Sequence, residues 1–403
     1  MIRVGIECES IEDQSWGVGR IVKKLLEEIS KRPELQKEFK FFLHFKSKIP
    51  DLPYLDNLIF VKKVVKLPLM RPSFSVYYYL LLPIRLYFEK LDLMFFPNYM
   101  LPVIFRGKSL VMLTEDVYYE FKQGTLPLRY RLAYKIFANW AAKHATKIMA
   151  ISETSKSELT KLFGIEPERI VVNQLGVDAP SVIPNSQFPI PNKISNSKFP
   201  IQKEIGNWIL EIGNYVLYIG QAFPRRHLKE TMLAFEQLVS EPKTYNLKPE
   251  TLHLIAIGKD KYYPPVIEKL KNEINHRLGY DGIIHKEYVP EDELQELYAG
   301  AQALIYISSK EAFGLPPLEA LARGTVSIVA DSTVTREIFG NSAFFVNNPD
   351  SPDSIAAIFV EALTNQAKRE EILKSASQIL EKYTWERHLN RFLETIKTIA
   401  KRG

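Results

Sequence analysis

Short apolar runs rich in β-branched and aromatic residues alternate with longer amphipathic stretches along most of the chain. The first cycle consists of an apolar run at residues 4–6, an amphipathic stretch at 19–29 and a second apolar run at 41–43. A strand, helix, strand rhythm of this kind is typical of parallel sheets that are covered by helices. This pattern limits the possible folds more than any other feature, and it predicts an α/β protein.

The alternation forms two series. The first has expected strands at residues 4–6, 41–43, 93–96, 110–113, 148–151 and 170–172, and the second at 215–219, 252–257, 303–307 and 326–330. A length of 403 residues also suits two domains of roughly 150 to 200 residues each. Between the series, residues 179–213 are dense in Pro, Asn and Ser, and the hexapeptide at 185–190 recurs in similar form at 196–201. We interpret this stretch as a linker or insertion.

The basic character of the chain belongs to its first half. Residues 1–180 contain 27 Lys and Arg against 20 Asp and Glu, whereas residues 181–403 contain 26 against 27. Within residues 62–147, 14 basic and 5 acidic side chains are interleaved with aromatic residues: Phe74, Tyr77, Tyr78, Tyr79, Tyr87 and Phe88. One interpretation is a surface for anionic lipid headgroups. The other is that the lysines solvate helix faces while the aromatic rings lie in the core. Because no nucleic-acid-binding module is recognisable, we expect no nucleic-acid partner.

Cysteine and histidine usage argues against disulfides and metal sites. Cys8 is the single cysteine, and the seven histidines show no zinc-type ligand spacing. The first residues lack the apolar stretch of a secretory signal, and the most apolar segment, at 76–88, is shorter than the ~20 residues that span a bilayer. We therefore expect a cytoplasmic protein, with the inner membrane face as its possible peripheral site.

Candidate binding residues follow the expected strands, because ligands of doubly wound sheets bind at the carboxyl ends of the strands. Gly17 and Gly19 stand at the start of an expected helix, where backbone N–H groups and the helix dipole can approach an anion. The alternative is that these glycines merely permit a turn. Arg225 and Arg226 follow the strand at 215–219 and can hold a diphosphate through charge-assisted hydrogen bonds. A plain surface arginine pair is the alternative here.

The strongest candidate is the stretch after the strand at 303–307. Gly314 supplies freedom for a turn, and two prolines at 316–317 preset φ for a helix that begins there. The N–H groups of residues 313–315 would then face an anion. Glu311 and Glu319 flank this turn, and carboxylates suit the paired hydroxyls of a sugar. Taken separately, a solvated loop acid and an acid paired with the helix dipole remain the alternatives.

The segment from Glu311 to Glu319 resembles the motif of retaining family-4 glycosyltransferases, the group 1 glycosyltransferases, in which seven residues separate two glutamates. The resemblance covers nearly the whole chain. It is also carried by residues 17–20, 151–156, 175–178, 218–228 and 288–298. It implies the GT-B fold, in which two facing Rossmann-like doubly wound domains enclose the active site in a cleft.

The resemblance also implies a role for each expected domain. Residues 1–180 would form an N-terminal, acceptor-binding Rossmann-like domain, 181–213 the linker or insertion, and 214–383 the nucleotide-sugar-binding domain. Residues 384–403 would form a C-terminal helix that crosses back to the first domain. Before it, residues 353–382 are expected to form one amphipathic helix.

Roles for single residues follow from the same resemblance. Glu311 would bind the donor sugar, Glu319 the nucleotide ribose, and Arg226, supported by Arg225, the diphosphate. The expected donor site is completed by Gly17, Gly19, Gly220, Gly258, Tyr288, Val289, Phe313, Gly314 and Leu315.

Three positions depart from the family pattern. Glu115 and Asp116 stand where members commonly have His-Asp facing the donor sugar, and we count both with Glu311 and Arg226 as candidate catalytic residues. Ala312 replaces a glycine, and Gln221 replaces an arginine that binds phosphate in many members.

These features predict a retaining hexosyltransferase that uses a nucleotide sugar, GDP-mannose or a UDP-hexose, without cofactor or metal. The acceptor would be a lipid-linked or polysaccharide intermediate of cell-surface glycan synthesis. A sugar-nucleotide epimerase or a phosphorylase of the same fold is the first alternative. A non-catalytic scaffold or binding protein that retains the fold is the second.

Overall fold

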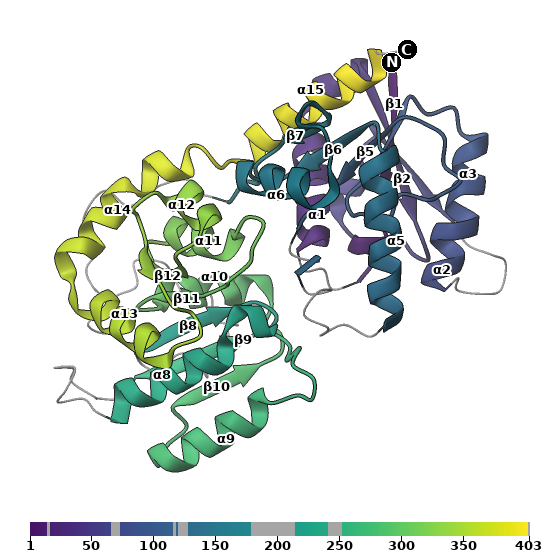
Figure 1. Ribbon diagram of the computed structural model, residues 1–403. Coiled ribbons are helices and arrows are strands. Elements are labelled where there is room, and N and C mark those ends of the chain that lie inside the picture. Colours follow the sequence, from purple (N-terminus) through teal and green to yellow (C-terminus); the bar gives the residue numbers. More distant parts are fainter. Residues whose placement is uncertain are drawn as a thin grey trace. The chain divides into compact units, whose positions relative to one another are not determined.

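The computed structural model describes residues 1–13, 17–65, 73–115, 118–119, 128–178, 214–240 and 252–401. The expected linker at 181–213 and the candidate Asp116 lie outside these residues. The chain divides into two compact units (Figure 1). Unit 1 comprises Met1–Gly176 and Tyr383–Gly403, and unit 2 comprises Val177–Lys382. The first unit thus ends a little before the expected boundary at 180, and it includes the C-terminal segment.

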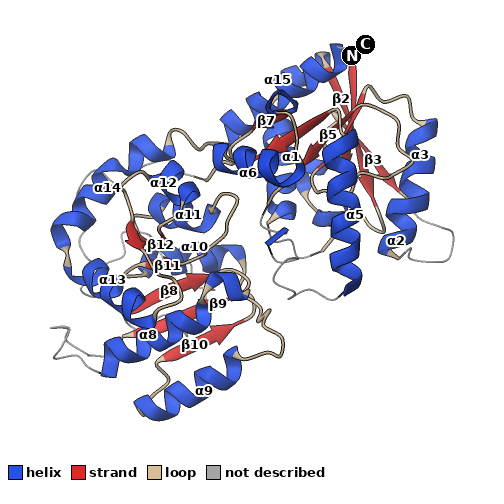
Figure 2. Cartoon of the chain, in the orientation of Figure 1, coloured by secondary structure: helices blue, strands red, loops and turns tan. Residues whose placement is uncertain are grey.

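Unit 1 is built on a sheet of seven parallel strands in the order β3-β2-β1-β4-β5-β6-β7 (Figure 2). The sheet is buried on both faces, and its central strands accordingly consist of nearly continuous apolar runs. The strands are β1 (Ile2–Glu7), β2 (Phe39–Phe45), β3 (Phe60–Val64), β4 (Leu93–Phe96), β5 (Ser109–Met112), β6 (Lys147–Ala150) and β7 (Ile170–Val172).

Alternate residues of a strand point to opposite faces of the sheet, and helices cover the side chains on both faces. In β4, Met94 and Phe96 lie in a core cluster with residues of the helices on one side. Phe95 between them contacts Phe392 on the other side, with ring centroids 5.1 Å apart. The helices of unit 1 are α1 (Val18–Ser30), α2 (Phe74–Val76), α3 (Leu82–Phe88), α5 (Leu128–His144), α6 (Glu153–Phe163) and α15 (Trp385–Lys401), with a π-helical turn (Tyr77–Leu81) before α3.

The C-terminal helix α15 packs on unit 1 against α1, β1 and β4. The segment after β7 contacts the start of α15 at Gly176, where a Cβ atom would lie 2.1 Å from the backbone nitrogen of Trp385. The start of the helix is also held by side chains: Asn173 Nδ2 donates to the carbonyl of His388 at 3.2 Å, and the His388 ring hydrogen-bonds the carbonyl of Gln174. Only a residue without a side chain therefore fits at position 176.

The substitution Gly176→Ala is expected to lower the free energy of unfolding by about 2 to 3 kcal/mol, because the added methyl group overlaps backbone atoms that cannot rotate away. Urea denaturation followed by circular dichroism measures the change. Ser157→Ala, at an exposed position of α6, is the control and should shift stability by less than about 0.5 kcal/mol. Equal stability of the two variants would contradict the close approach.

Unit 2 contains a second parallel sheet, of six strands in the order β10-β9-β8-β11-β12-β13. The strands are β8 (Tyr215–Ile219), β9 (His253–Ile257), β10 (Ile283–Lys286), β11 (Leu304–Tyr306), β12 (Ser327–Ala330) and β13 (Phe344–Val346). The helices are α8 (Leu228–Ser240), α9 (Ile267–Leu278), α10 (Glu291–Gly300), α11 (Leu315–Ala322), α12 (Thr333–Phe339), α13 (Pro352–Thr364) and α14 (Gln366–Leu380). The predicted α/β class with two doubly wound sheets is confirmed.

Two details differ from the sequence-based expectations. Strands β3, β10 and β13 had not been predicted, and each is an edge strand of its sheet. The single helix expected over residues 353–382 is wrong, because the chain breaks at Asn365 into α13 and α14. The Asn365 side chain accepts a hydrogen bond from the N–H of Lys368, so the residue ends one helix and caps the next.

Within the described part of the chain, no helix combines the length and the apolar character needed to cross a membrane.

Candidate functional site

The two strongest sequence candidates meet at the carboxyl edge of the unit 2 sheet. Strands β8 and β11 are neighbours, with Tyr218 beside Ile305 in register. The loop after β8 runs through Gly220 into a short 3-10 helix (Pro224–Arg226) that presents the arginine pair. The loop after β11 contains Glu311 and leads into α11. Adjacent strands therefore bring together residues more than 80 positions apart in the sequence.

Glu311 is bound by both arginines. Arg225 Nη1 donates to Glu311 Oε1 at 2.8 Å, and also to the hydroxyl of Ser308 and the carbonyl of Lys310. Arg226 donates to the same oxygen from Nε at 3.1 Å and from Nη2 at 2.8 Å, and Nη2 lies 3.4 Å from Glu311 Oε2. All three side chains are largely buried. The loops after β8 and β11 are thus joined by one ionic cluster.

This cluster keeps all three groups charged. Burial alone would raise the pKa of Glu311, but the charges of Arg226 and Arg225 outweigh it and lower that pKa to about 2. Burial also opposes the charge on Arg226, and the Glu311 carboxylate outweighs this effect, so the pKa of Arg226 is raised. Two cations facing one carboxylate leave an excess of positive charge, which suits an anionic ligand.

Gly220 leaves the space that Arg226 occupies. A Cβ atom at position 220 would lie 2.5 Å from Arg226 Nη1, and the residue has a φ of 127°, which side chains disfavour. Gly258, at the end of the neighbouring strand β9, packs directly against the carbonyl of Gly220. These two predicted site residues therefore lie together beside the arginine cluster.

The turn before α11 has the predicted form. Gly314 precedes the helix with a φ of 108°, Leu315 begins it, and Phe313 is buried. Glu319 lies within α11 and is 6% exposed. Its Oε2 accepts a hydrogen bond of 2.8 Å from the hydroxyl of Tyr298 in α10. The carboxylate is therefore oriented by a neighbouring helix rather than directed into solvent.

The remaining candidates are more dispersed. Tyr288, partly exposed, and Val289, buried, lie between β10 and α10. Gly17 and Gly19 belong to unit 1, where Gly17 precedes α1 and Gly19 is buried in its first turn. No group of three or more His, Cys, Asp or Glu side chains among the described residues is arranged to hold a metal ion.

Glu115 is held inside unit 1. It follows β5, is 2% exposed, and its Oε2 accepts a hydrogen bond of 2.5 Å from the hydroxyl of Ser155. Ser155 lies in the first turn of α6, which Ser152 caps. Glu115 therefore connects the end of β5 to α6, and its contact with a donor sugar stays a prediction.

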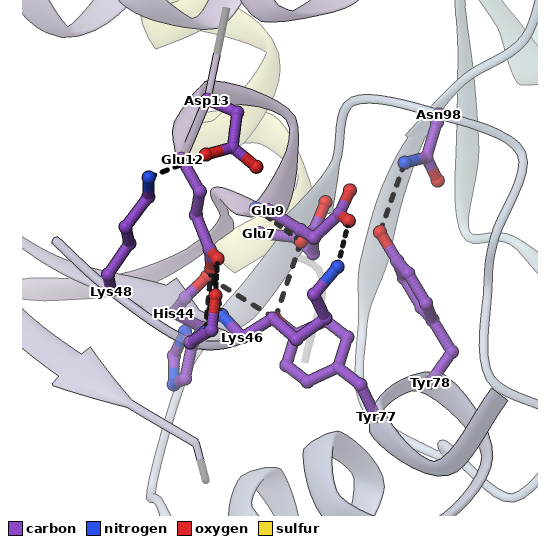
Figure 3. Close-up of polar contacts among 11 residues, drawn as sticks. Glu7, Glu9, Glu12, Asp13, His44, Lys46, Lys48, Tyr77, Tyr78 and Asn98 are labelled. Atoms are coloured by element: carbon purple, nitrogen blue, oxygen red, sulfur yellow. Dashed lines mark hydrogen bonds and ion pairs between the residues drawn. The ribbon is translucent and has the colours of Figure 1, made fainter. Parts of the chain in front are cut away.

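A polar cluster that the sequence analysis missed lies at the carboxyl end of β1 (Figure 3). Glu7, the last residue of β1, is fully buried, and its Oε1 accepts hydrogen bonds from the N–H of Glu9 at 2.7 Å and from the hydroxyl of Tyr77 at 3.3 Å. Beside it, the hydroxyl of Tyr78 accepts a hydrogen bond from Asn98. Burial raises the pKa of Glu7 to about 8, so this carboxyl group is protonated at neutral pH. The only sequence signal was an acid at the end of an apolar run.

Comparison with known proteins gives a family match within unit 2. The family model of the glycosyl transferases group 1 matches residues 206–379. This range contains the arginine pair, both glutamates and the turn between them. The chain carries a group 1 glycosyltransferase domain.

Relatives and solved structures agree with this family. The chain is 28% identical over 242 residues to the O-antigen chain mannosyltransferase B of Escherichia coli, covering 60% of this chain and 58% of that protein. Its fold is similar to that of WaaG, a glycosyltransferase involved in lipopolysaccharide biosynthesis, with a TM-score of 0.68 at 18% identity over the whole of both chains. HepE of Anabaena, solved in complex with UDP-glucose, gives a TM-score of 0.69 at 15% identity, covering 99% of this chain and 100% of that one.

The family match confirms the predicted group 1 glycosyltransferase domain over residues 206–379. The solved structures confirm the GT-B fold with two Rossmann-like domains. The matched domain is that of a glycosyltransferase. The matched region spans a little over half the length of the curated mannosyltransferase.

The raised pKa of Glu7 makes stability depend on pH. The carboxyl group ionises near 4.5 when unfolded but near 8 when folded, so its contribution is complete below pH 4.5 and is lost as the pH rises through 8. Glu7→Gln removes this titration, so the variant should gain stability relative to wild type between pH 5 and pH 9, on the order of a few kcal/mol. Urea denaturation at several pH values measures the difference. The exposed Glu34→Gln is the control, and parallel pH profiles for Glu7→Gln and wild type would contradict the assignment.

Proposed function

We propose that this group 1 glycosyltransferase moves a hexose from a nucleotide sugar to a glycan or lipid-linked acceptor in cell-surface glycan synthesis, with retention of anomeric configuration. The observation that carries the proposal is the buried cluster of Arg225, Arg226 and Glu311 at the carboxyl ends of β8 and β11. The acceptor class is supported by the O-antigen mannosyltransferase relative. The donor is GDP-mannose or a UDP-hexose: that relative favours mannose, and the UDP-glucose complex of HepE supports a uridine nucleotide.

Departure of the nucleoside diphosphate is the step that the cluster would assist. The breaking glycosidic bond leaves negative charge on the β-phosphate, and fixed donors stabilise such charge best where water is excluded. Arg226, with Arg225 behind it, would supply this stabilisation together with the N–H groups of Phe313, Gly314 and Leu315. We propose that no metal is required and that the leaving phosphate accepts the proton of the acceptor hydroxyl on the same face of the sugar.

Glu311 would have two tasks. In the free protein it balances the arginines through Oε1, which takes the three shortest contacts. Oε2 has the longer contact of 3.4 Å and is the better placed oxygen for a hydroxyl of the donor sugar. A bound diphosphate would compete with Glu311 for Arg226 and turn the carboxylate toward the sugar. This assigns Glu311 as a sugar-binding residue and not as a nucleophile.

Arg226→Ala and Glu311→Ala should each reduce kcat/KM for donor turnover by about 10² to 10³-fold, because one removes a phosphate ligand and the other leaves two buried cations unbalanced. A panel of nucleotide sugars with released nucleoside diphosphate as the readout measures the loss. Arg336→Gln, which breaks an exposed ion pair with Asp331 in the same unit, is the control and should keep wild-type turnover. Thermal unfolding of each variant distinguishes lost activity from lost fold, and near wild-type turnover in a folded Arg226→Ala protein would refute the phosphate role.

Glu319 is proposed to bind the hydroxyls of the nucleotide ribose. Loss of a hydrogen bond to a charged group costs about 1.5 to 3 kcal/mol, so Glu319→Ala should weaken donor binding at least tenfold in calorimetry. Tyr298→Phe keeps the carboxylate and removes the hydroxyl that orients it, and it should have the smaller effect. Wild-type donor affinity in Glu319→Ala would exclude the ribose assignment.

The two alternatives, an epimerase or phosphorylase and a non-catalytic scaffold, predict different results in the same assays. An epimerase would convert the nucleotide sugar without an acceptor, and a phosphorylase would require inorganic phosphate. A scaffold would bind none of the nucleotide sugars. The family match and the mannosyltransferase relative favour transfer to an acceptor over both alternatives.

A further inference from the structure

Unit 1 has two neighbouring hollows beside α3. The larger, about 560 Å³, lies between the end of α3 and the segment that leads into β5, and the smaller, about 400 Å³, lies beside Arg3 near the start of β1. Phe88 and Glu89 line both hollows, which makes them one continuous face. None of the described candidate residues of unit 1, Gly17, Gly19 and Glu115, lines either hollow.

Large apolar side chains are exposed on this face. Tyr87 is 85% exposed and Phe88 77% exposed, and their rings lie edge to face at the end of α3. Ile84 and Ile104 on the wall of the larger hollow are 46% and 58% exposed. Soluble proteins rarely leave contiguous apolar groups of this size in water, and such patches mark interaction sites.

The same face is strongly basic. The single carboxylate that lines the hollows, Glu89, already has an ion pair with Arg85 at 2.6 Å and a hydrogen bond with the His44 ring at 2.8 Å. Asp92 nearby accepts a hydrogen bond from the backbone N–H of Arg3. The cations that line the two hollows are Arg3, Lys63, Arg85, Lys90, Arg106 and Lys108.

We propose that this basic aromatic face, formed by the lining residues of the two hollows, docks on the surface of a bilayer that contains anionic lipids. Exposed Tyr, Phe and Ile side chains gain free energy by entering the boundary between headgroups and acyl chains. The surrounding Lys and Arg side chains gain about 1 kcal/mol each from the negative surface potential. The apolar gain does not explain the basic side chains, and the electrostatic gain does not explain the exposed apolar ones. An anionic bilayer accounts for both sets.

Electrostatic repulsion argues against a second copy of this chain as the occupant of the face. In a twofold dimer the face would meet its own copy, so six cations would oppose six cations. An acidic protein would satisfy the charges, and the experiment below distinguishes it from lipid. The inference does not rest on the proposed transferase activity, although it would hold such an enzyme at a surface where lipid-linked acceptors lie.

Co-sedimentation of the full chain with vesicles tests the proposal. The protein should bind vesicles of phosphatidylcholine with phosphatidylglycerol at least tenfold more strongly than vesicles of phosphatidylcholine alone, and high salt should weaken this binding. Tyr87→Ser with Phe88→Ser, and separately Lys63→Gln with Lys90→Gln, should each reduce binding to the anionic vesicles at least tenfold.

The matched controls are Ile49→Ser, an exposed apolar position of unit 1, and Lys229→Gln with Lys374→Gln, exposed lysines of unit 2. These should bind as wild type does. Equal binding to neutral and anionic vesicles, or full binding by the Tyr87 and Phe88 variant, would overturn the proposal. So would dimerisation in sedimentation velocity that is lost in that variant, or lipid-independent capture of an acidic protein. Donor binding by calorimetry should be unchanged in all variants, which distinguishes failure of this proposal from failure of the proposed transferase function.

Discussion

Two guanidinium groups and one carboxylate buried together hold the carboxyl edge of the unit 2 sheet in a single arrangement. Arg225 and Arg226 come from the loop after β8 and Glu311 from the loop after β11, so the ion pairs join two neighbouring strand ends. Removal of Glu311 would leave two buried guanidinium groups without a carboxylate, which is far more costly than the net gain from the intact cluster. The space at Gly220 and the turn into α11 are arranged around this cluster. The proposed donor site depends on it for both shape and charge.

A comparison of Glu311 with Glu7 shows how surroundings decide protonation. Both side chains are largely buried, and both follow or end a strand of a parallel sheet. The charges of two arginines lower the pKa of Glu311 to about 2, whereas burial, together with the negative charge of Glu9, raises the pKa of Glu7 to about 8. At neutral pH one carboxyl group therefore accepts hydrogen bonds as an anion, and the other is a neutral group within the fold.

The sequence pattern predicted the central strands and the loops that carry the unit 2 cluster, because buried parallel strands are continuous apolar runs and their carboxyl ends are the binding edge. It missed the edge strands β3 and β10 because charged and polar residues interrupt their apolar pattern: Lys62 and Lys63 lie within β3, and His285 and Lys286 within β10. It also missed β13, an apolar strand of only three residues. It could not show that Glu311 binds Arg225 and Arg226, since that contact depends on which strands are neighbours. Nor could it separate core aromatics from surface ones: Tyr77 and Tyr78 are buried, while Tyr87 and Phe88 are exposed.

Binding of a nucleotide-sugar diphosphate by the cluster of Arg225, Arg226 and Glu311 can be observed in a crystal structure of the protein with GDP or UDP bound. We expect diphosphate oxygens within hydrogen-bond distance of Arg226 and ribose hydroxyls at the carboxylate of Glu319. A nucleotide bound elsewhere, with Arg226 still paired to Glu311 as in the free protein, would contradict this expectation.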